Sequence, residues 1–211
     1  MFRDLIEKSP HCARNAFEFN LKEAVEITRE YDENGNGSNV QTLEPNGFVF
    51  HESRCGSTLV ANSLAAMNPS QTRVYSESGP PLSVLQSCGE EFGSCGKEQV
   101  AAFFQDVVYM MGRTDNPDEK HMFFKIQSAG SKFISILNVA FPDAPWVFVY
   151  RDPVEVMMSH LDIPKMERAN CLRTMKRPTK AIRNMVKAKG EDLRNLSPED
   201  FCAIHLVRYL C

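Results

Sequence analysis

The residues with the clearest chemical potential form a short polar turn between an apolar segment and a helical pattern. The turn lies within His51–Leu59, HESRCGSTL, and contains Arg54, Gly56, Ser57 and Thr58. A turn that leads into a helix exposes backbone N–H groups at the positive end of the helix dipole, which favours a bound phosphate. Gly56 permits close approach of the backbone, and the Arg54 guanidinium adds a forked, permanently charged donor. The sequence therefore predicts a phosphate site here.

This turn differs from the phosphate loop of nucleotide hydrolases, whose pattern is GxxxxGK[ST]. It lacks the first Gly, and no Lys precedes its hydroxyl residues. The sequence of this turn therefore argues against ordinary hydrolysis of ATP or GTP. A simpler interpretation, in which Ser57 only caps a helix, leaves Arg54 without a role.

A second motif follows the apolar run Trp146–Tyr150, WVFVY. Arg151 stands where this expected strand ends, Asp152 is a candidate N-cap, and Pro153 occupies the first helical position. Ser159 lies about two turns into the expected helix. An Arg and a hydroxyl can hold one phosphate together, whereas the alternative is a capped helix with Arg151 in a surface ion pair.

Together the two motifs resemble those of the P-loop sulfotransferases. SRCGST resembles the loop that binds the 5′-phosphosulfate in that family, with a basic residue, a small residue, Gly and two hydroxyl residues. The second motif resembles the family's 3′-phosphate site, an apolar strand that ends in Arg-(Asp/Asn)-Pro with a Ser eight residues after the Arg. The resemblance spans Gly47 to Leu161. Within it, the segment FPDAPWVFVYRDPVEVMMSHL is similar to a bacterial and algal branch of the family. It assigns cofactor binding to Arg54, Cys55, Gly56, Ser57, Thr58, Arg151 and Ser159.

The resemblance implies a sulfotransferase that moves a sulfonate group from 3′-phosphoadenosine-5′-phosphosulfate (PAPS) to a hydroxyl or amine of a small-molecule or carbohydrate acceptor. It implies no metal. Cytosolic members use a His in a Lys-Thr-His strand, but Gln127 in Lys-Ile-Gln cannot accept a proton here. Other branches use a Glu soon after the first motif, which makes Glu77 the candidate base. Lys125 would stabilise charge on the bridging or sulfonate oxygens, and His51 and His160 rank lower as candidate bases.

Strand-like and helical segments alternate along the chain. Residues 47–53, 73–76, 121–127 and 146–150 are expected strands, and residues 57–67, 97–111, 131–140 and 153–159 are expected helices. The 57–67 helix would bury Leu59, Val60, Leu64 and Met67. The run 146–150 is apolar on both faces, which places it inside a covered sheet. This pattern predicts an α/β fold, a three-layer parallel sheet with helices on both faces, and the resemblance implies a P-loop NTPase-like (sulfotransferase-like) version.

The chain has 211 residues and a net charge of −3, which suits one domain. We expect an N-terminal helical extension and loop over 1–46 and a sulfotransferase-like domain over 47–211. Because members of the family that the chain resembles continue beyond the second motif, we expect that the domain is truncated at its C-terminus; the alternative is a shortened member of the family. Residues 165–194 carry +7, either as a solvated face or as part of a nucleotide lid, and the lid candidates are Arg168, Arg173, Lys176 and Arg177.

Neither a secretory signal nor an apolar run long enough for a membrane span is present, so a cytoplasmic protein is expected. The net charge of −3 alone argues neither for nor against nucleic acid, and no nucleic-acid partner is expected. Seven Cys with no CxxC pair make a metal framework or a disulfide scaffold unexpected. Cys88 and Cys95 flank a Gly-rich loop and either pair in an oxidising compartment or stay free.

Two other functions remain open. A small-molecule P-loop kinase would require Mg²⁺ and the missing Lys. A non-catalytic module would bind adenosine nucleotides but transfer nothing, which Gln127 makes plausible.

Overall fold

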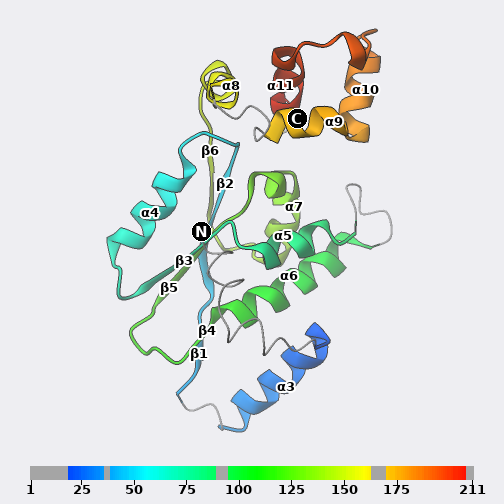
Figure 1. Cartoon of the computed structure of the whole chain (residues 1–211). Coiled ribbons are helices and arrows are strands. Elements are labelled where there is room, and N and C mark those ends of the chain that lie inside the picture. Colours follow the sequence, from blue (N-terminus) through cyan, green and yellow to red (C-terminus); the bar gives the residue numbers. More distant parts are fainter. Residues whose placement is uncertain (1–18, 36–38, 89–94, 163–169, 208–211) are drawn as a thin grey trace, which may run out of the picture.

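Figure 1 shows the computed structural model of the chain, which describes residues 19–35, 39–88, 95–162 and 170–207. Its centre is a sheet of four parallel strands: β2 (Pro45–His51), β3 (Thr72–Ser76), β5 (His121–Lys125) and β6 (Trp146–Val149). The strand order is β3-β5-β2-β6. Two short antiparallel strands, β1 (Gln41–Thr42) and β4 (Arg113–Thr114), pair separately.

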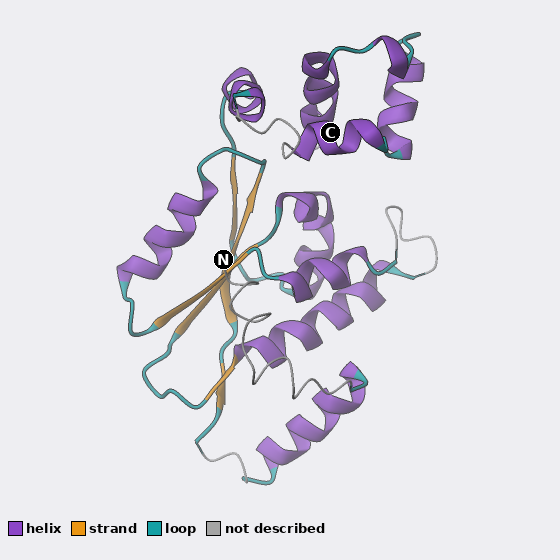
Figure 2. Ribbon diagram, viewed as in Figure 1, coloured by secondary structure: helices purple, strands orange, loops and turns teal. Residues whose placement is uncertain are grey.

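Helices cover both faces of this sheet, as the ribbon in Figure 2 shows. Helix α4 lies on one face, and α5, α6 and α7 lie on the other (Figure 1). The predicted α/β class, with a parallel sheet flanked by helices, is confirmed. The described helices from the start of the chain to the one that follows β6 are α3 (Leu21–Glu33), α4 (Ser57–Met67), α5 (Gly79–Gln86), α6 (Lys97–Gly112), the 3₁₀ turn η1 (Ser128–Phe133), α7 (Ile134–Ala140) and α8 (Pro153–Leu161).

The direction of the connections places a crevice at the sheet's carboxyl edge. Strand β2 continues into α4 on one face, whereas its neighbour β5 continues through η1 into α7 on the other. In parallel sheets, ligands bind outside the carboxyl ends of strands at such a point. The turn after His51 and the residues after Lys125 both lie at this edge.

The main core fills the space between the sheet and helices α5 to α7. Phe48 and Phe50 of β2 alternate onto this side and are almost completely buried, as is Phe124 of β5. Phe104 of α6 packs against Phe48, with ring centroids 6.2 Å apart. Since this packing extends along β2, the strand that leads into the phosphate turn is firmly anchored.

Two expectations about burial are wrong. Strand β6 lies at the edge of the sheet, and Trp146 and Val147 are 44% and 52% exposed, because no described strand pairs with its outer side. In α4, Leu59 and Met67 are exposed and only Ser57 and Ala61 are buried. Helix α4 contacts the sheet mainly at β3, and it lies apart from the other labelled helices in Figure 1.

The first described helix, α3, packs onto α6. Asp32 forms an ion pair with Arg113, and the Tyr109 hydroxyl donates to Asp32 over 2.9 Å. Arg29 lies over the Tyr109 ring, 4.4 Å from its centroid. Strand β2 begins at Pro45, close to the predicted boundary at residue 46. The division into an extension and a domain stays a prediction.

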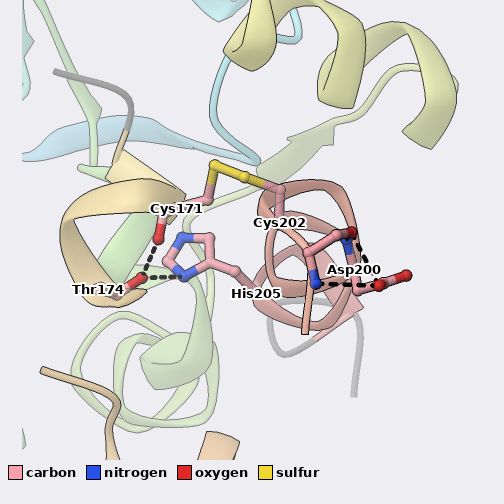
Figure 3. The surroundings of a disulfide bond; sticks show 6 residues. Cys171, Thr174, Asp200, Cys202 and His205 are labelled. Atoms are coloured by element: carbon pink, nitrogen blue, oxygen red, sulfur yellow. Dashed lines mark hydrogen bonds between the residues drawn. A yellow bond between two sulfur atoms is a disulfide. The ribbon is translucent and has the colours of Figure 1, made fainter. Parts of the chain in front are cut away.

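The end of the described chain forms a helical unit beside α8 (Figure 1). Its elements are α9 (Asn170–Lys176), α10 (Lys180–Ala188), a 3₁₀ turn η3 (Leu193–Asn195) and α11 (Pro198–Val207). A buried disulfide between Cys171 and Cys202 joins α9 to α11, and Thr174 and His205 form a hydrogen bond of 3.1 Å beside it (Figure 3). We call this unit, residues 170–207, the C-terminal helical unit.

The described part of the chain contains two disulfides, Cys88–Cys95 and Cys171–Cys202. The open question about Cys88 and Cys95 is thus answered in favour of pairing, and the expectation of no disulfide scaffold is wrong. Disulfides persist in oxidising compartments and are rare in the cytosol. The cytoplasmic location stays a prediction, and these bonds weigh against it. No helix within the described ranges is both long and apolar enough to cross a membrane.

Candidate functional site

The turn between β2 and α4 has an unusual backbone. Gly56 precedes the first residue of α4 with φ of 91°, and Arg54 has φ of 66°. A Cβ on Gly56 would meet no atom within 4 Å, so glycine is favoured there by conformation and not by space. Arg54 and Glu77 are the non-glycine residues with positive φ in the described part of the chain. Such conformations cost about 1–3 kcal/mol each and concentrate at functional sites.

Arg54 and Glu77 both line one cavity of about 640 Å³ at the carboxyl edge of the sheet. A volume of that size falls in the range of small-molecule sites, roughly 300–1,000 Å³. The predicted residues among its lining come from the turn after β2, the start of α4, the residue after β3, the β6–α8 connection and α8 itself: Arg54, Gly56, Ser57, Thr58, Glu77, Arg151 and Ser159. His51, Ser53, Gln127, Ser128 and Ala129 complete the lining.

The two sequence motifs meet directly in this cavity. Arg54 Nε donates to Ser159 Oγ over 2.9 Å, across 105 residues of sequence. The side chains that were assigned separately to a 5′-phosphosulfate and a 3′-phosphate therefore form one polar surface. Cys55 is half-buried and does not line the cavity, so its assignment to cofactor binding stays a prediction that this geometry does not support.

Arg151 is positioned through its backbone. Its N–H donates over 2.6 Å to the Glu52 carboxylate, which is 2% exposed and belongs to the turn after β2. Asp152 caps α8 by accepting from Val154 N and Glu155 N, as predicted. The Arg151 guanidinium forms an exposed ion pair with Glu155. Exposed pairs contribute only about 0–1 kcal/mol, so a bound anion can compete for Arg151.

Lys125 lies beneath the cavity rather than on its wall. It is 2% exposed and forms an ion pair with Glu77, whose side chain is 46% exposed. The Glu77 backbone is held from the same strand, because its N–H donates to Lys125 O over 2.8 Å. Gln127 Nε2 donates to Glu77 O over 3.0 Å. Gln127 thus supports the conformation of Glu77.

Glu77 is strongly acidic in this arrangement. Contact with His51 is the main cause that lowers its pKa from 4.5 to about 2; partial burial opposes the shift, and the Lys125 ammonium adds to it. His51 Nε2 lies 3.4 Å from Glu77 Oε1, and Nδ1 lies 2.8 Å from the Glu52 carbonyl. The 3.4 Å contact is long for a hydrogen bond, and His51 Nε2 has no hydrogen-bond partner in the described part of the chain.

His160 is buried just below the cavity. It is 2% exposed, and its ring nitrogens have no hydrogen-bond partner in the described part of the chain. Burial, and then the charge of Arg54, lower its pKa. His160 does not line the cavity, so it cannot meet a substrate there without rearrangement.

None of the lid candidates whose side chains are described lines the cavity. Arg168 lies outside the described residues, and the side chain of Arg173 is also not described. Lys176 and Arg177 are exposed on the C-terminal helical unit and do not line the cavity. Within the described ranges, no group of three His, Cys, Asp or Glu side chains is placed to hold a metal ion.

Sequence reasoning missed two features of the cavity. One is the wall formed by Ser128 and Ala129 at the start of η1. The other is the buried Glu52, whose position inside the first motif was the only available signal.

Comparisons of the chain with protein-family models, with curated proteins and with solved structures found no match.

Proposed function

We propose that the chain binds PAPS in this cavity and transfers its sulfonate group to a hydroxyl or amine acceptor. The observation that carries the proposal is the hydrogen bond between Arg54 and Ser159, which brings the two predicted phosphate-binding motifs into one cavity. Arg54 and Arg151 supply permanent charge at its wall, and Ser57, Thr58 and Ser159 supply hydroxyl donors. This combination suits a ligand with two separated phosphate groups.

The fold is compatible with this proposal. In a P-loop NTPase-like fold, the phosphate turn follows a central strand and opens a helix, as the turn between β2 and α4 does. Strand β2 lies between β5 and β6, so the groups that follow all three strands converge on the ligand. We propose the P-loop NTPase-like assignment on this basis.

In the proposed reaction the acceptor oxygen or nitrogen attacks sulfur as the bond between sulfur and the bridging oxygen of PAPS breaks. The acceptor proton passes to the Glu77 carboxylate, and 3′,5′-bisphosphoadenosine leaves. Lys125 does not line the cavity in this structure, so it would have to move toward the ligand to stabilise the charge that develops on the bridging oxygen. No metal takes part in this scheme.

Glu77 with a pKa of about 2 is a weak proton acceptor at neutral pH. The proposal therefore requires ligand binding to break both contacts that lower this pKa, the larger one with His51 and the further one with Lys125. Loss of the two contacts would raise the pKa of Glu77 toward the range of a useful base. Ligand binding and activation of the base would then be one event.

The low pKa also favours a second candidate function, a non-catalytic module that binds adenosine nucleotides. In that case the ion pair between Glu77 and Lys125 would persist in the complex and no sulfonate would move. Release of 3′,5′-bisphosphoadenosine from PAPS in the presence of an acceptor distinguishes the two functions.

The selectivity of the site tests the proposal. We expect the chain to bind 3′,5′-bisphosphoadenosine roughly 10- to 150-fold more tightly than 5′-AMP, since hydrogen bonds to charged groups contribute about 1.5–3 kcal/mol. Arg151→Ala should remove most of this preference in a calorimetric titration. Arg194→Ala, which removes an exposed arginine outside the cavity, is the control and should retain it. Equal affinity of the wild-type chain for both nucleotides would refute the assignment.

A further inference from the structure

Helix α10 presents positive charge that the proposed activity does not use. Between residues 170 and 190 the sequence has seven Lys or Arg and no Asp or Glu, whereas the chain as a whole has a net charge of −3. Six of these cations are exposed: Lys176, Arg177, Lys180, Arg183, Lys187 and Lys189. None of the six forms an ion pair with a described residue, in contrast to Arg73, Arg113, Lys125 and Arg151.

Three of them are aligned along one side of α10. Lys180, Arg183 and Lys187 have spacings of three and four residues, which places them in a row on a helix. The row extends over about 10 Å at 1.5 Å per residue. We call these three residues the basic stripe. Ile182 and Val186, on the other side of α10, are buried against Phe201 of α11.

The basic stripe stands on a rigid base. The Ile182 and Val186 contacts fix α10 to α11, and the Cys171–Cys202 disulfide fixes α11 to α9 (Figure 3). Figure 1 places α10 on the outer side of the C-terminal helical unit, beyond α11 as seen from α8. The charges are therefore held in a fixed row on an accessible surface, which suits an extended partner with repeated negative charges.

The chemistry of the surface narrows the class of partner. Residues 170–200 include no Phe, Tyr or Trp, so the unit's basic side has no ring on which nucleobases could stack. The exposed positions of α10 are polar or small, namely Lys180, Arg183, Asn184, Lys187 and Ala188, and provide no large apolar side chain to insert into a membrane. The two disulfides favour an oxidising compartment, where nucleic acid and the anionic cytoplasmic leaflet are absent.

We propose that the basic stripe binds a linear acidic polysaccharide, through ion pairs between its three cations and carboxylate or sulfate groups of successive sugars. This surface is separate from the cavity, since none of its residues lines it. The proposal does not depend on sulfonate transfer.

The test compares two triple variants of the full chain in binding to a polyuronate, alginate. Lys180→Gln/Arg183→Gln/Lys187→Gln removes the basic stripe. Lys22→Gln/Lys120→Gln/Lys132→Gln removes three exposed cations elsewhere and loses the same net charge. At about 1 kcal/mol for each cation near an anionic surface, the stripe variant should bind roughly 100-fold more weakly. The control variant should change by less than about threefold, and neutral dextran should not bind.

Salt, competitors and a second variant complete the test. Affinity of the wild-type chain should fall steeply with salt, and the slope should decrease in the stripe variant. Lys187→Glu alone should weaken binding by about tenfold or more, which covers the case in which the triple variant does not fold. The proposal is overturned if the two triple variants lose affinity equally, or if alginate does not bind at low salt. Tighter binding of duplex DNA or phosphatidylserine vesicles at equal salt would overturn the choice of partner.

Discussion

Glu77→Gln should destabilise the fold in a pH-dependent way. In the folded chain the pKa of Glu77 is lowered from 4.5 to about 2, with His51 as the largest cause and Lys125 as a further one. That difference corresponds to at most about 3.4 kcal/mol at 1.36 kcal/mol per pH unit. Because the Glu77 side chain is 46% exposed, solvent screening reduces the contribution to about 1 kcal/mol.

The direction follows from the lowered pKa. A carboxyl that is more acidic in the folded state stabilises the fold above its unfolded pKa, near 4.5, and loses this contribution as the pH falls towards 2. The Gln variant also leaves Lys125, whose side chain is 1% exposed, without its carboxylate, which adds to the loss. We therefore expect Glu77→Gln to cost about 1–3 kcal/mol at pH 7 and less than half of that at pH 3.

Urea unfolding at pH 7, 5 and 3 measures this difference as a shift of the midpoint. Lys125→Met is the matched partner, because it removes the buried charge and keeps an unbranched side chain. The double variant should be more stable than the sum of the two single losses predicts, since the charges are in contact. A loss of stability that is the same at pH 7 and pH 3, or strict additivity of the two variants, would refute the described role of the ion pair.

Three further predictions concern other groups. Arg54→Ala should weaken binding of 3′,5′-bisphosphoadenosine by roughly 10- to 150-fold in calorimetry, and unchanged affinity in a folded variant would remove the first motif from the site. Glu52→Ala should reduce the preference for the bisphosphate over 5′-AMP, because the Arg151 backbone loses its acceptor; Glu52→Gln should retain the preference, and loss in both variants would contradict this role. The Cys171→Ser/Cys202→Ser variant should lose about 3–4 kcal/mol, as expected for a crosslink across 31 residues, and an unfolding midpoint equal to that of the wild type would show that the bond does not stabilise the fold.

The sequence contained most of the local structure of this chain. The apolar run before the phosphate turn and the pattern over residues 57–67 correspond to β2 and α4, and Asp152 and Pro153 begin α8 as predicted. Those features depend on short-range preferences for strand, cap and turn. The carboxyl edge of a parallel sheet then brings the two motifs together, as the Arg54 contact with Ser159 shows.

Features that depend on distant packing were predicted less well. The apolar faces of β6 could not indicate whether another strand lies beside it, and Trp146 is partly exposed at the sheet edge. The pairing of Cys171 with Cys202 depends on how α9 and α11 meet, and the odd number of cysteines concealed it. The low pKa of Glu77 could not be foreseen either, because it depends on contacts with side chains from two other strands.

Calorimetric titration of the wild-type chain with 3′,5′-bisphosphoadenosine, and separately with ATP, tests the central claim most directly. A site built from two phosphate-binding motifs without the nucleotidase lysine should bind the bisphosphate in the absence of Mg²⁺. It should bind ATP at least about tenfold more weakly, with no gain when Mg²⁺ is added, because the loss of one charged contact is worth about 1.5–3 kcal/mol. Binding of ATP that requires Mg²⁺, with no measurable binding of the bisphosphate, would contradict the proposed site and favour a P-loop kinase.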